Sequence, residues 1–291
     1  MLKNKSLNRG HGFKPSKRLG QHFLKDFSVI RDIIDRAEYK KSDHILEIGP
    51  GMGALTIPLS ERVEKIVAVE KDPRLVELLG KKLLDKGILN VVLINDDILK
   101  LDLRGAIETS SEKIKVIGNL PYNISSPFLE KLINHRDLIR EAVLMLQYEF
   151  ARRLLSQPGV KDYGGITVLT RYNASIKRLF EVSREAFHPR PKVGSMVISV
   201  NMGEFHPRRA VDEELFKKVV KGAFAHRRKT VLNSLKGTLK DYEGEKISIA
   251  LKDCGIDPRR RAETIDIEEY LSLTATLKRM HDFQKNNSEK L

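Results

Sequence analysis

Apolar residues in the first two thirds of the chain gather in short, nearly continuous runs, and amphipathic stretches with helical spacing separate them. Apolar strands that alternate with helices predict a parallel sheet covered on both faces. The two last runs flank a proline-rich segment and are expected to pair as a final hairpin. The predicted strands are His44–Ile48, Lys65–Glu70, Val91–Asn95, residues 115–118, residues 141–147, Ser175–Val182 and Ser195–Asn201. The pattern predicts an α/β domain with a mostly parallel, seven-stranded sheet that ends in an antiparallel hairpin.

The strand pattern stops near residue 203, and further on residues such as Leu215, Val219 and Leu235 recur near helical spacing. We therefore expect a small, all-α C-terminal domain after a linker around His206-Pro207. The predicted division is a basic, flexible arm over residues 1–16, an α/β domain over residues 17–205 and a helical domain over residues 206–291.

The net charge of the chain indicates what kind of partner it binds. Lysine and arginine outnumber aspartate and glutamate by 53 to 39, a formal net charge of +14. Such a surplus is typical of proteins that bind a nucleic acid, with a charge-rich thermophile surface as the alternative. The first acidic residue is Asp26, and we expect the basic residues before it to contact RNA phosphates.

Several classes of protein are excluded by composition. No apolar run approaches the roughly 20 residues that a membrane span needs, and the N-terminus lacks the apolar segment of a secretory signal. Cys254 is the only cysteine, so neither an internal disulfide nor a cysteine-based zinc site is expected. No set of His, Asp and Glu residues has the spacing of metal ligands. We expect a cytoplasmic protein without a metal or a membrane partner.

A glycine-rich turn, Glu47-Ile48-Gly49-Pro50-Gly51-Met52-Gly53, follows the first predicted strand. Glycines let the chain turn tightly and let its backbone approach a ligand closely. Glu70 ends the next strand, where a carboxylate can accept both hydroxyl hydrogen bonds of a ribose. Because Gly49, Gly51 and Ala54 also satisfy the dinucleotide fingerprint, a nicotinamide-dependent dehydrogenase and a structural glycine turn stay open here.

Two further details favour a methyl donor over a dinucleotide. Glu47 stands just before the glycines, where it can orient the ammonium group of a methionine moiety. Asp96 and Asp97 close the third strand, where a carboxylate can accept a hydrogen bond from an adenine amino group. For one of these two aspartates, capping of a helix is the alternative role. The combination predicts S-adenosylmethionine as the cofactor.

The candidate chemistry lies in the tetrapeptide Asn119-Leu120-Pro121-Tyr122, at the end of the fourth predicted strand. Adenine N6 is a poor nucleophile because its lone pair is delocalised into the ring, and hydrogen-bond acceptors around N6 counteract this. The Asn119 Oδ1 atom and the Leu120 carbonyl can be those acceptors, with Pro121 fixing the backbone. Tyr122 offers a ring on which an extruded base can stack. The alternative is an Asn-Pro turn followed by a core tyrosine, but ligands bind at the carboxyl ends of parallel strands.

Together these motifs resemble the ribosomal RNA adenine dimethyltransferase family over nearly the whole chain. The similar segments, in the family's order, are residues 17–26, residues 47–56, Glu70, Asp97, residues 119–122 and residues 187–193. The resemblance implies a Rossmann-like class I methyltransferase domain that uses S-adenosylmethionine. It implies cofactor-binding roles for Gln21, His22, Leu24, Glu47, Gly49, Gly51, Gly53, Glu70, Asp97 and Asn119. It also implies that Phe187 sandwiches the target base opposite Tyr122.

The branch of the family is indicated by residues 119–124, 147–150 and 161–164. They resemble the branch that dimethylates two adjacent adenines in a hairpin near the 3′ end of small-subunit RNA and has a role in small-subunit biogenesis. The resemblance thus implies small-subunit ribosomal RNA in an immature subunit as the partner. Since nothing in the sequence suggests an obligate dimer, we expect a monomer. The alternatives are a large-subunit enzyme of the macrolide-resistance type and a mainly non-catalytic ribosome-assembly factor.

Two basic clusters are candidates for contact with RNA. Arg227, Arg228 and Lys229 lie in a segment that we expect to be helical, and a second cluster consists of Arg259, Arg260 and Arg261. Such side chains contact phosphates and give a salt-dependent affinity with little sequence information. A solvated helix face is the alternative for either cluster.

Overall fold

The computed structural model describes residues 13–107 and 113–288, so most of the expected basic arm lies outside the described residues. The strands are β1 Phe23–Leu24, β2 His44–Ile48, β3 Lys65–Glu70, β4 Val91–Asn95, β5 Ile114–Asn119, β6 Ile139–Gln147, β7 Ser175–Val182, β8 Phe187–His188 and β9 Ser195–Asn201. The α-helices are α1 Phe27–Arg36, α2 Thr56–Ser60, α3 Pro73–Asp85, α4 Leu103–Ala106, α5 Ser125–Asn134, α6 Tyr148–Leu155, α7 Gly165–Asn173, α8 Glu213–Phe224, α9 Val231–Thr238, α10 Gly244–Asp253 and α11 Ile267–Ser288. Short 3₁₀ turns lie at Lys17–Leu19, Arg184–Ala186 and Ala262–Thr264.

Seven strands form the central sheet in the order β4-β3-β2-β5-β6-β9-β7. The pairs among β4, β3, β2, β5 and β6 are all parallel, and β9 is antiparallel to both β6 and β7. The expected parallel sheet with a final antiparallel hairpin is confirmed. Two strands are longer than predicted, because Ile114 and Ile139 pair with each other ahead of the apolar runs.

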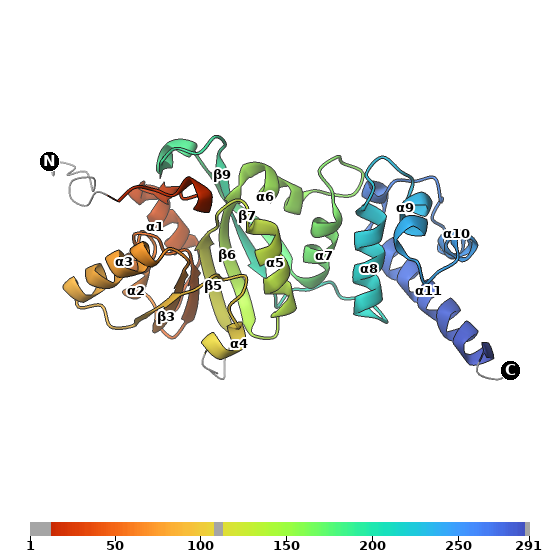
Figure 1. Ribbon diagram of the computed structural model, residues 1–291, viewed down its shortest axis with the longest axis horizontal. Helices are drawn as coiled ribbons and strands as arrows, with labels where there is room; N and C mark the ends of the chain where they lie inside the picture. Colours follow the sequence, from red (N-terminus) through yellow and green to blue (C-terminus); the bar gives the residue numbers. More distant parts are fainter. Residues whose placement is uncertain (1–12, 108–112, 289–291) are drawn as a thin grey trace.

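Helices cover both faces of this sheet, as Figure 1 shows. Alternate side chains of β2 illustrate the two layers. Ile45 belongs to the apolar core that contains α1 and α2, whereas Leu46 belongs to the core that contains α5 and α6. Because the inner strands β2, β5, β6 and β9 are buried on both sides, most of their residues are apolar, whereas the edge strand β7 carries exposed polar residues.

A third core lies at the C-terminal end of the elongated molecule, among helices α8 to α11 (Figure 1). Helix α7 contributes to it through Val168 and Tyr172, and the Tyr172 ring lies 4.5 Å from the Phe216 ring, centre to centre. Ile166, on the same helix, packs against the core of the sheet instead. The two cores therefore meet at α7, and the division near residue 205 stays a prediction. Across the described residues, no helix has the length and apolar character that crossing a membrane would require.

A small second sheet ties the N-terminal segment to the segment after β7. Its two strands are antiparallel, with Phe23 opposite His188 and Leu24 opposite Phe187. Since β1 lies far from β8 in the sequence, this pairing holds the N-terminal segment over the carboxyl ends of the central strands.

A buried ion pair lies near the amino ends of β2 and β5. The Lys115 ammonium is 2.8 Å from the Asp43 carboxylate, and the two side chains are 8 % and 13 % exposed. The Lys115 Nζ atom also lies 5.4 Å from the centre of the Tyr39 ring. Removing one partner of a buried pair leaves the other charge in a poorly solvated place.

We expect Lys115→Ala to lower the free energy of unfolding by about 3 kcal/mol, because the Asp43 carboxylate loses its partner. Urea unfolding measures this change. Lys177→Ala is the control, since the Lys177–Glu204 pair is mostly exposed and 3.8 Å long. It should cost less than about 0.5 kcal/mol. Equal losses in both variants would contradict the assignment of Lys115 as the stabilising partner.

Candidate active site

A cavity of about 1960 Å³ opens at the carboxyl ends of β2, β3, β4 and β5. The structure brings all the residues expected to bind a cofactor to its walls: Gln21, His22, Leu24, Glu47, Gly49, Gly51, Gly53, Glu70, Asp97 and Asn119. Leu120, Pro121 and Tyr122 of the tetrapeptide line the same cavity. The parallel strands explain this, because their carboxyl ends share one edge of the sheet.

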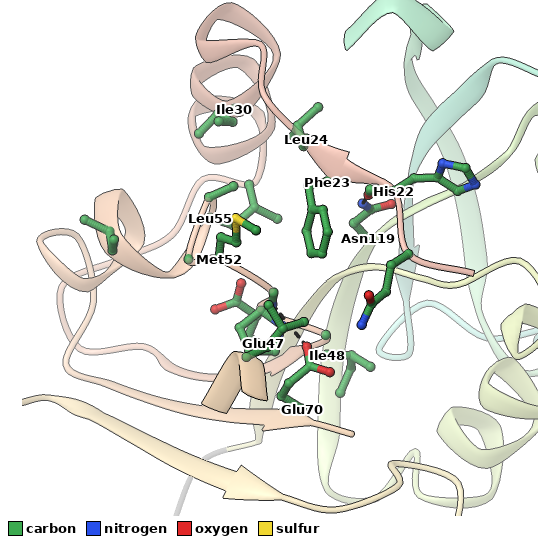
Figure 2. Close-up of a pocket in the computed structure, with 18 of the residues that line it drawn as sticks. His22, Phe23, Leu24, Ile30, Glu47, Ile48, Met52, Leu55, Glu70 and Asn119 are labelled. Carbon is green, nitrogen blue, oxygen red and sulfur yellow. Dashed lines mark hydrogen bonds between the residues drawn. The ribbon is translucent and has the colours of Figure 1, made fainter. Parts of the chain in front are cut away.

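The glycine turn shapes the floor of the cavity. Gly51 has a φ of +57° and Gly53 a φ of +84°, which L side chains rarely adopt. A Cβ atom on Gly53 would lie 2.6 Å from the Leu79 side chain, and one on Gly51 would lie 3.2 Å from the Phe23 ring. Figure 2 shows Phe23 pointing into the cavity toward this turn. The positive φ therefore favours glycine at both positions, and a side chain at Gly53 would also force the Leu79 side chain to move.

Glu47 is a buried carboxylate on the cavity wall. Its residue is 1 % exposed, and its Oε2 atom has no hydrogen-bond partner among the residues that the structure describes. Burial, with a smaller contribution from the Glu70 charge, raises the pKa of Glu47 to about 7. A buried acceptor of this kind fits a cationic hydrogen-bond donor such as an ammonium group.

Glu70 is held by backbone donors at the end of β3. Its Oε2 atom accepts a hydrogen bond from the Gly51 N–H at 3.2 Å, and its Oε1 atom accepts one from the Asp72 N–H at 2.9 Å (Figure 2). Burial raises the pKa of Glu70 above its ordinary value. The glycine turn and the strand end are thus joined through one carboxylate.

Asp97 lies at the next strand end and has a different environment. Its Oδ2 atom is 2.7 Å from the Lys71 ammonium, and its Oδ1 atom accepts a hydrogen bond from the Leu99 N–H at 3.0 Å. The Lys71 ammonium holds the pKa of Asp97 below its usual range. Asp97 therefore stays an ionised acceptor, and it also stabilises the turn that follows β4.

Asn119 ends β5, and its amide has a defined orientation. The Nδ2 atom donates a hydrogen bond to the His22 carbonyl at 3.1 Å. Because a carbonyl only accepts, the nitrogen must face His22, and the Oδ1 end of the amide is left for a ligand.

Tyr122 lies beside Asn119 and is half-buried. Its ring stacks on the His22 ring, with centres 5.8 Å apart and an interplanar angle of 28°. Its hydroxyl is 3.5 Å from the Ser195 hydroxyl. Burial raises the pKa of Tyr122, so the side chain is a neutral phenol at neutral pH.

Phe187 does not take the place expected for it. Its side chain is 2 % exposed and packs in the core of the α1 and α2 face with Leu24 and Val197. The register of the small sheet explains this, since Phe187 lies opposite the buried Leu24 and the next residue, His188, turns toward the cavity. Phe187 therefore does not line the cavity in this structure, where the His22 ring faces Tyr122, and the expected sandwich of the base by Phe187 and Tyr122 stays a prediction.

Sequence reasoning missed how the N-terminal segment is fastened. The Gln21 amide donates to Asp72 at 2.9 Å and accepts from the Ser16 N–H at 2.7 Å, so it anchors the segment. Arg74 hydrogen-bonds Asp72 and lowers the pKa of that carboxyl to about 2, and Arg74 also lies over the Phe13 ring. Asp72 before Pro73 signals a helix start, but its partner Gln21 is 51 positions away and no local pattern reveals it. The expected contact of Gln21 with a cofactor stays a prediction.

The first basic cluster lies in a turn and not on a helix, which corrects our expectation. Helix α8 ends at Phe224, and Thr230 caps α9 by accepting a hydrogen bond from the Asn233 N–H. Residues 226–229 are the turn between these helices. The Val231 N–H donates to the Arg260 carbonyl at 2.7 Å, so the second cluster lies next to the first.

The side chains of the two clusters are not equally available. Arg260 pairs with Glu269, Arg259 lies 3.1 Å from Asp257, and Arg227 donates to the Lys161 carbonyl. Arg228, Lys229 and Arg261 are exposed, and their side chains form no hydrogen bond or ion pair with residues 13–107 and 113–288. The same described part of the chain contains no group of three or more His, Cys, Asp and Glu side chains that could hold a metal ion.

Comparison with known proteins gives consistent matches. A family profile described as "Ribosomal RNA adenine dimethylase" matches residues 12–279. The chain is 45 % identical over 265 residues to "Ribosomal RNA small subunit methyltransferase A" of Desulforapulum autotrophicum. The matched segment covers 91 % of this chain and 93 % of that protein. Among solved structures, a dimethyladenosine transferase from Plasmodium falciparum superposes with a TM-score of 0.73 at 27 % identity and covers 88 % of this chain and 98 % of that one. The 23S rRNA methyltransferase ErmE gives 0.64 at 28 % identity, with coverage of 88 % and 99 %.

The raised pKa of Glu47 predicts a pH-dependent effect on stability. The ordinary value is 4.5 and the folded value about 7, so between these pH values folding favours the protonated carboxyl. Stability is therefore lost as the pH rises from about 4.5 to about 7, and the loss is complete above that range. We expect Glu47→Gln to raise the free energy of unfolding by on the order of 3 kcal/mol at pH 8 and to change it little at pH 4.

Urea unfolding at the two pH values tests this expectation. The matched control is Glu61→Gln, an exposed residue at the rim of the same cavity, which should change stability little at either pH. An effect of Glu47→Gln that is the same at pH 4 and pH 8 would show that the buried charge is not its cause.

Proposed function

This chain belongs to the ribosomal RNA adenine dimethylase family, and we propose that it dimethylates N6 of two adjacent adenines in a hairpin near the 3′ end of small-subunit ribosomal RNA, with S-adenosylmethionine as the methyl donor. The observation that carries the proposal is the Asn119 amide, whose Oδ1 atom is left for a ligand at the end of β5, in the same cavity as the buried Glu47. A role in small-subunit biogenesis is part of this proposal.

The walls of the cavity fit the parts of the proposed cofactor. The buried Glu47 would hold the ammonium group, Glu70 the ribose hydroxyls and Asp97 the adenine amino group, with the backbone of the glycine turn against the chain between them. When bound, S-adenosylmethionine supplies an electrophilic methyl group on its sulfonium. In a cationic complex the Glu47 carboxyl would be ionised, because a nearby positive charge lowers a carboxyl pKa.

The tetrapeptide would then prepare the target base. Asn119 Oδ1 and the Leu120 carbonyl accept hydrogen bonds from N6, which makes its lone pair more available, and the Tyr122 ring supports the extruded adenine. In each transfer the methyl–sulfur bond would break as the methyl–N6 bond forms, and the methylated N6 would then release one proton to water. Because the sulfonium is a strong electrophile, no ionised general base is required beforehand, so alignment of the reacting atoms is the main task of the site. The Asn119–His22 hydrogen bond keeps the acceptor end of the amide in place for this task.

The choice of the small-subunit branch is supported by the relatives. The protein of Desulforapulum autotrophicum that is named for the small subunit is 45 % identical to this chain, whereas ErmE, named for 23S rRNA, is 28 % identical. The large-subunit activity is the alternative. The exposed cations of the two basic clusters and the net charge of +14 support an RNA partner. The proposal also includes an immature small subunit as the substrate, a monomeric enzyme and a cytoplasmic location.

The test is transfer of labelled methyl groups from S-adenosylmethionine to purified small subunits that lack the modification, with large subunits in parallel. Digestion of the RNA identifies the modified nucleosides. We expect N6,N6-dimethyladenosine from small subunits alone. Label in the large subunits would move the protein to the other branch, and no label with intact cofactor binding would favour the assembly factor.

Asn119→Ala should reduce methyl transfer about 10²- to 10³-fold, as when one hydrogen-bonding group of an electrostatic site is removed. The affinity for RNA should stay nearly unchanged. Asn134→Ala, an exposed position at the end of α5, is the control and should keep full activity. A variant that loses RNA affinity in proportion to activity would indicate that Asn119 acts in folding or binding.

The exposed cations should set the salt dependence of RNA binding. We expect the double variant Arg228→Ala, Lys229→Ala to reduce the slope of log affinity against log salt by about 1.5 to 2, because each cation contributes about one phosphate contact. The matched control is Lys177→Ala, Arg178→Ala on β7, where both cations pair with glutamates. Filter binding over a range of salt measures both slopes, and equal slopes would exclude the first cluster as the phosphate contact.

A further inference from the structure

Residues 13–23, which we call the strap, line one wall of the cavity and lie outside the central sheet. The C-terminal end of the strap is held by the hydrogen bond from Asn119 to the His22 carbonyl and by the pairing of β1 with β8. Its N-terminal half, residues 13–21, forms no strand and is held to the rest of the protein by side chains that follow β3. This half can therefore move without breaking any strand pairing.

Asp72 is the point to which the N-terminal half of the strap is fastened. Its side chain is 3 % exposed, and its Oδ2 atom accepts a hydrogen bond from the Gln21 Nε2 atom at 2.9 Å. The Arg74 guanidinium donates to both carboxylate oxygens, at 2.9 Å from Nε and 2.6 Å from Nη2. The hydrogen bonds from Arg74 are the main reason that the pKa of Asp72 falls to about 2, so this acceptor stays charged at neutral pH.

Arg74 also contacts the strap directly. Its guanidinium carbon lies 4.8 Å from the centre of the Phe13 ring. The Phe13 ring meets the Phe23 ring edge to face, with centres 5.8 Å apart, and Phe23 lies against the glycine turn at Gly51. Arg74 thus holds the strap at two points, at Phe13 directly and at Gln21 through Asp72. We call these two contacts the latch.

The same tripeptide occurs a second time in the chain and shows what is particular to the latch. In Asp257-Pro258-Arg259 the arginine again pairs with the aspartate, at 3.1 Å, but the Asp257 side chain is 45 % exposed. The pairing of aspartate with arginine is therefore a local property of the tripeptide. The burial of Asp72 and its hydrogen bond from a glutamine 51 positions away are not local, and they need another explanation.

The latch adjoins the place proposed for the cofactor, because the Asp72 N–H donates to the Oε1 atom of Glu70 at 2.9 Å. We propose that Arg74 is a positioning residue that holds the strap closed over the ribose end of S-adenosylmethionine, and that the latch opens whenever the cofactor enters or its product leaves. This inference rests on the proposed function and adds the control of cofactor exchange to it. Every methyl group requires a new cofactor molecule, so the strap must open between successive transfers.

The contacts of the latch suit repeated opening. Arg74 is 54 % exposed, and a ring contact at such a site is individually weak. When the strap opens, the Gln21 amide can exchange its hydrogen bond for one to water, and Asp72 keeps its partner Arg74. No buried charge is left unpaired, which would make opening costly.

Phe13→Ala and Arg74→Ala test the proposal through the release of radiolabelled S-adenosylhomocysteine, the product form of the cofactor, into an excess of unlabelled ligand. A ring–ring contact and a ring–guanidinium contact each correspond to a factor of roughly 2 to 10. We therefore expect each variant to raise the dissociation rate about 5- to 50-fold and to raise the KM for S-adenosylmethionine without lowering kcat. Phe13→Tyr keeps both ring contacts and should stay within about threefold of the wild type.

Two controls separate the latch from a structural role. Phe13 is not part of the three apolar cores that the structure describes, so Phe13→Ala should leave the midpoint of urea unfolding unchanged. The matched control for Arg74 is Arg104→Ala. Arg104 likewise follows a helix-capping aspartate, Asp102, but it pairs with the exposed Asp137 and does not line the cavity. It should leave the dissociation rate unchanged.

Unchanged dissociation rates in Phe13→Ala and Arg74→Ala would overturn the proposal. Release from Phe13→Tyr as fast as from Phe13→Ala would also overturn it. Failure of the proposed function gives a different result. If the variants release the product faster but the wild type methylates neither subunit, the latch stands and the methylation of RNA is rejected. A wild type that does not bind the cofactor would reject both.

Discussion

The hydrogen bond from the Asn119 side chain to the His22 carbonyl joins two segments that are 97 positions apart. Its donor ends the central strand β5, and its acceptor belongs to the N-terminal segment that covers the carboxyl ends of the strands. The bond orients the amide oxygen of Asn119, and the His22 ring, whose Nδ1 atom is 2.7 Å from the Pro189 carbonyl, stacks on Tyr122. The other attachments of the segment, Gln21 to Asp72 and β1 to β8, hold the acceptor in position. The geometry of the candidate site thus depends on a segment outside the sheet.

The same site contains an electrostatic conflict that the fold does not relieve by itself. Glu47 is carried into the interior by β2, where alternate residues are core, and burial disfavours its charge. Glu70 nearby is also buried, but two backbone N–H groups stabilise its carboxylate. A ligand with a positive charge would resolve the conflict at Glu47, whereas a neutral ligand would not. The buried charge of Glu47 therefore both lowers the stability of the fold and favours a ligand with a positive charge.

Much of the fold could be predicted from the sequence because the sheet is buried on both faces. The bounds of β2, β3, β4, β7 and β9 coincide with the strands predicted from the sequence. Because the carboxyl ends of parallel strands share one edge of the sheet, the glycine turn, the acids and the tetrapeptide could be expected to lie together. The misses share a different origin. The burial of Phe187 depends on the register of a two-residue strand, and the turn at residues 226–229 depends on the helix cap at Thr230. The pairing of Gln21 with Asp72 and of His22 with Tyr122 joins distant positions, which leave no periodic signal in the chain.

The position of the basic clusters relative to the cavity is set by a continuous path through the fold. Strand β6 lies beside β5 in the sheet, and α6 leads from its end to residues 156–164. This loop contacts the first cluster through Arg227 on the Lys161 carbonyl, and it contacts the segment that follows the second cluster through the Gly159 N–H on the Glu263 carbonyl at 2.8 Å. Helix α7, which packs in both cores, follows the loop. Packed elements and these hydrogen bonds thus connect the region of the basic clusters to the strand edge that carries the tetrapeptide. On the proposed function, the RNA would be selected by its shape. It must present an unpaired adenine to the tetrapeptide while its backbone reaches the basic clusters. Such selection needs few contacts to base edges.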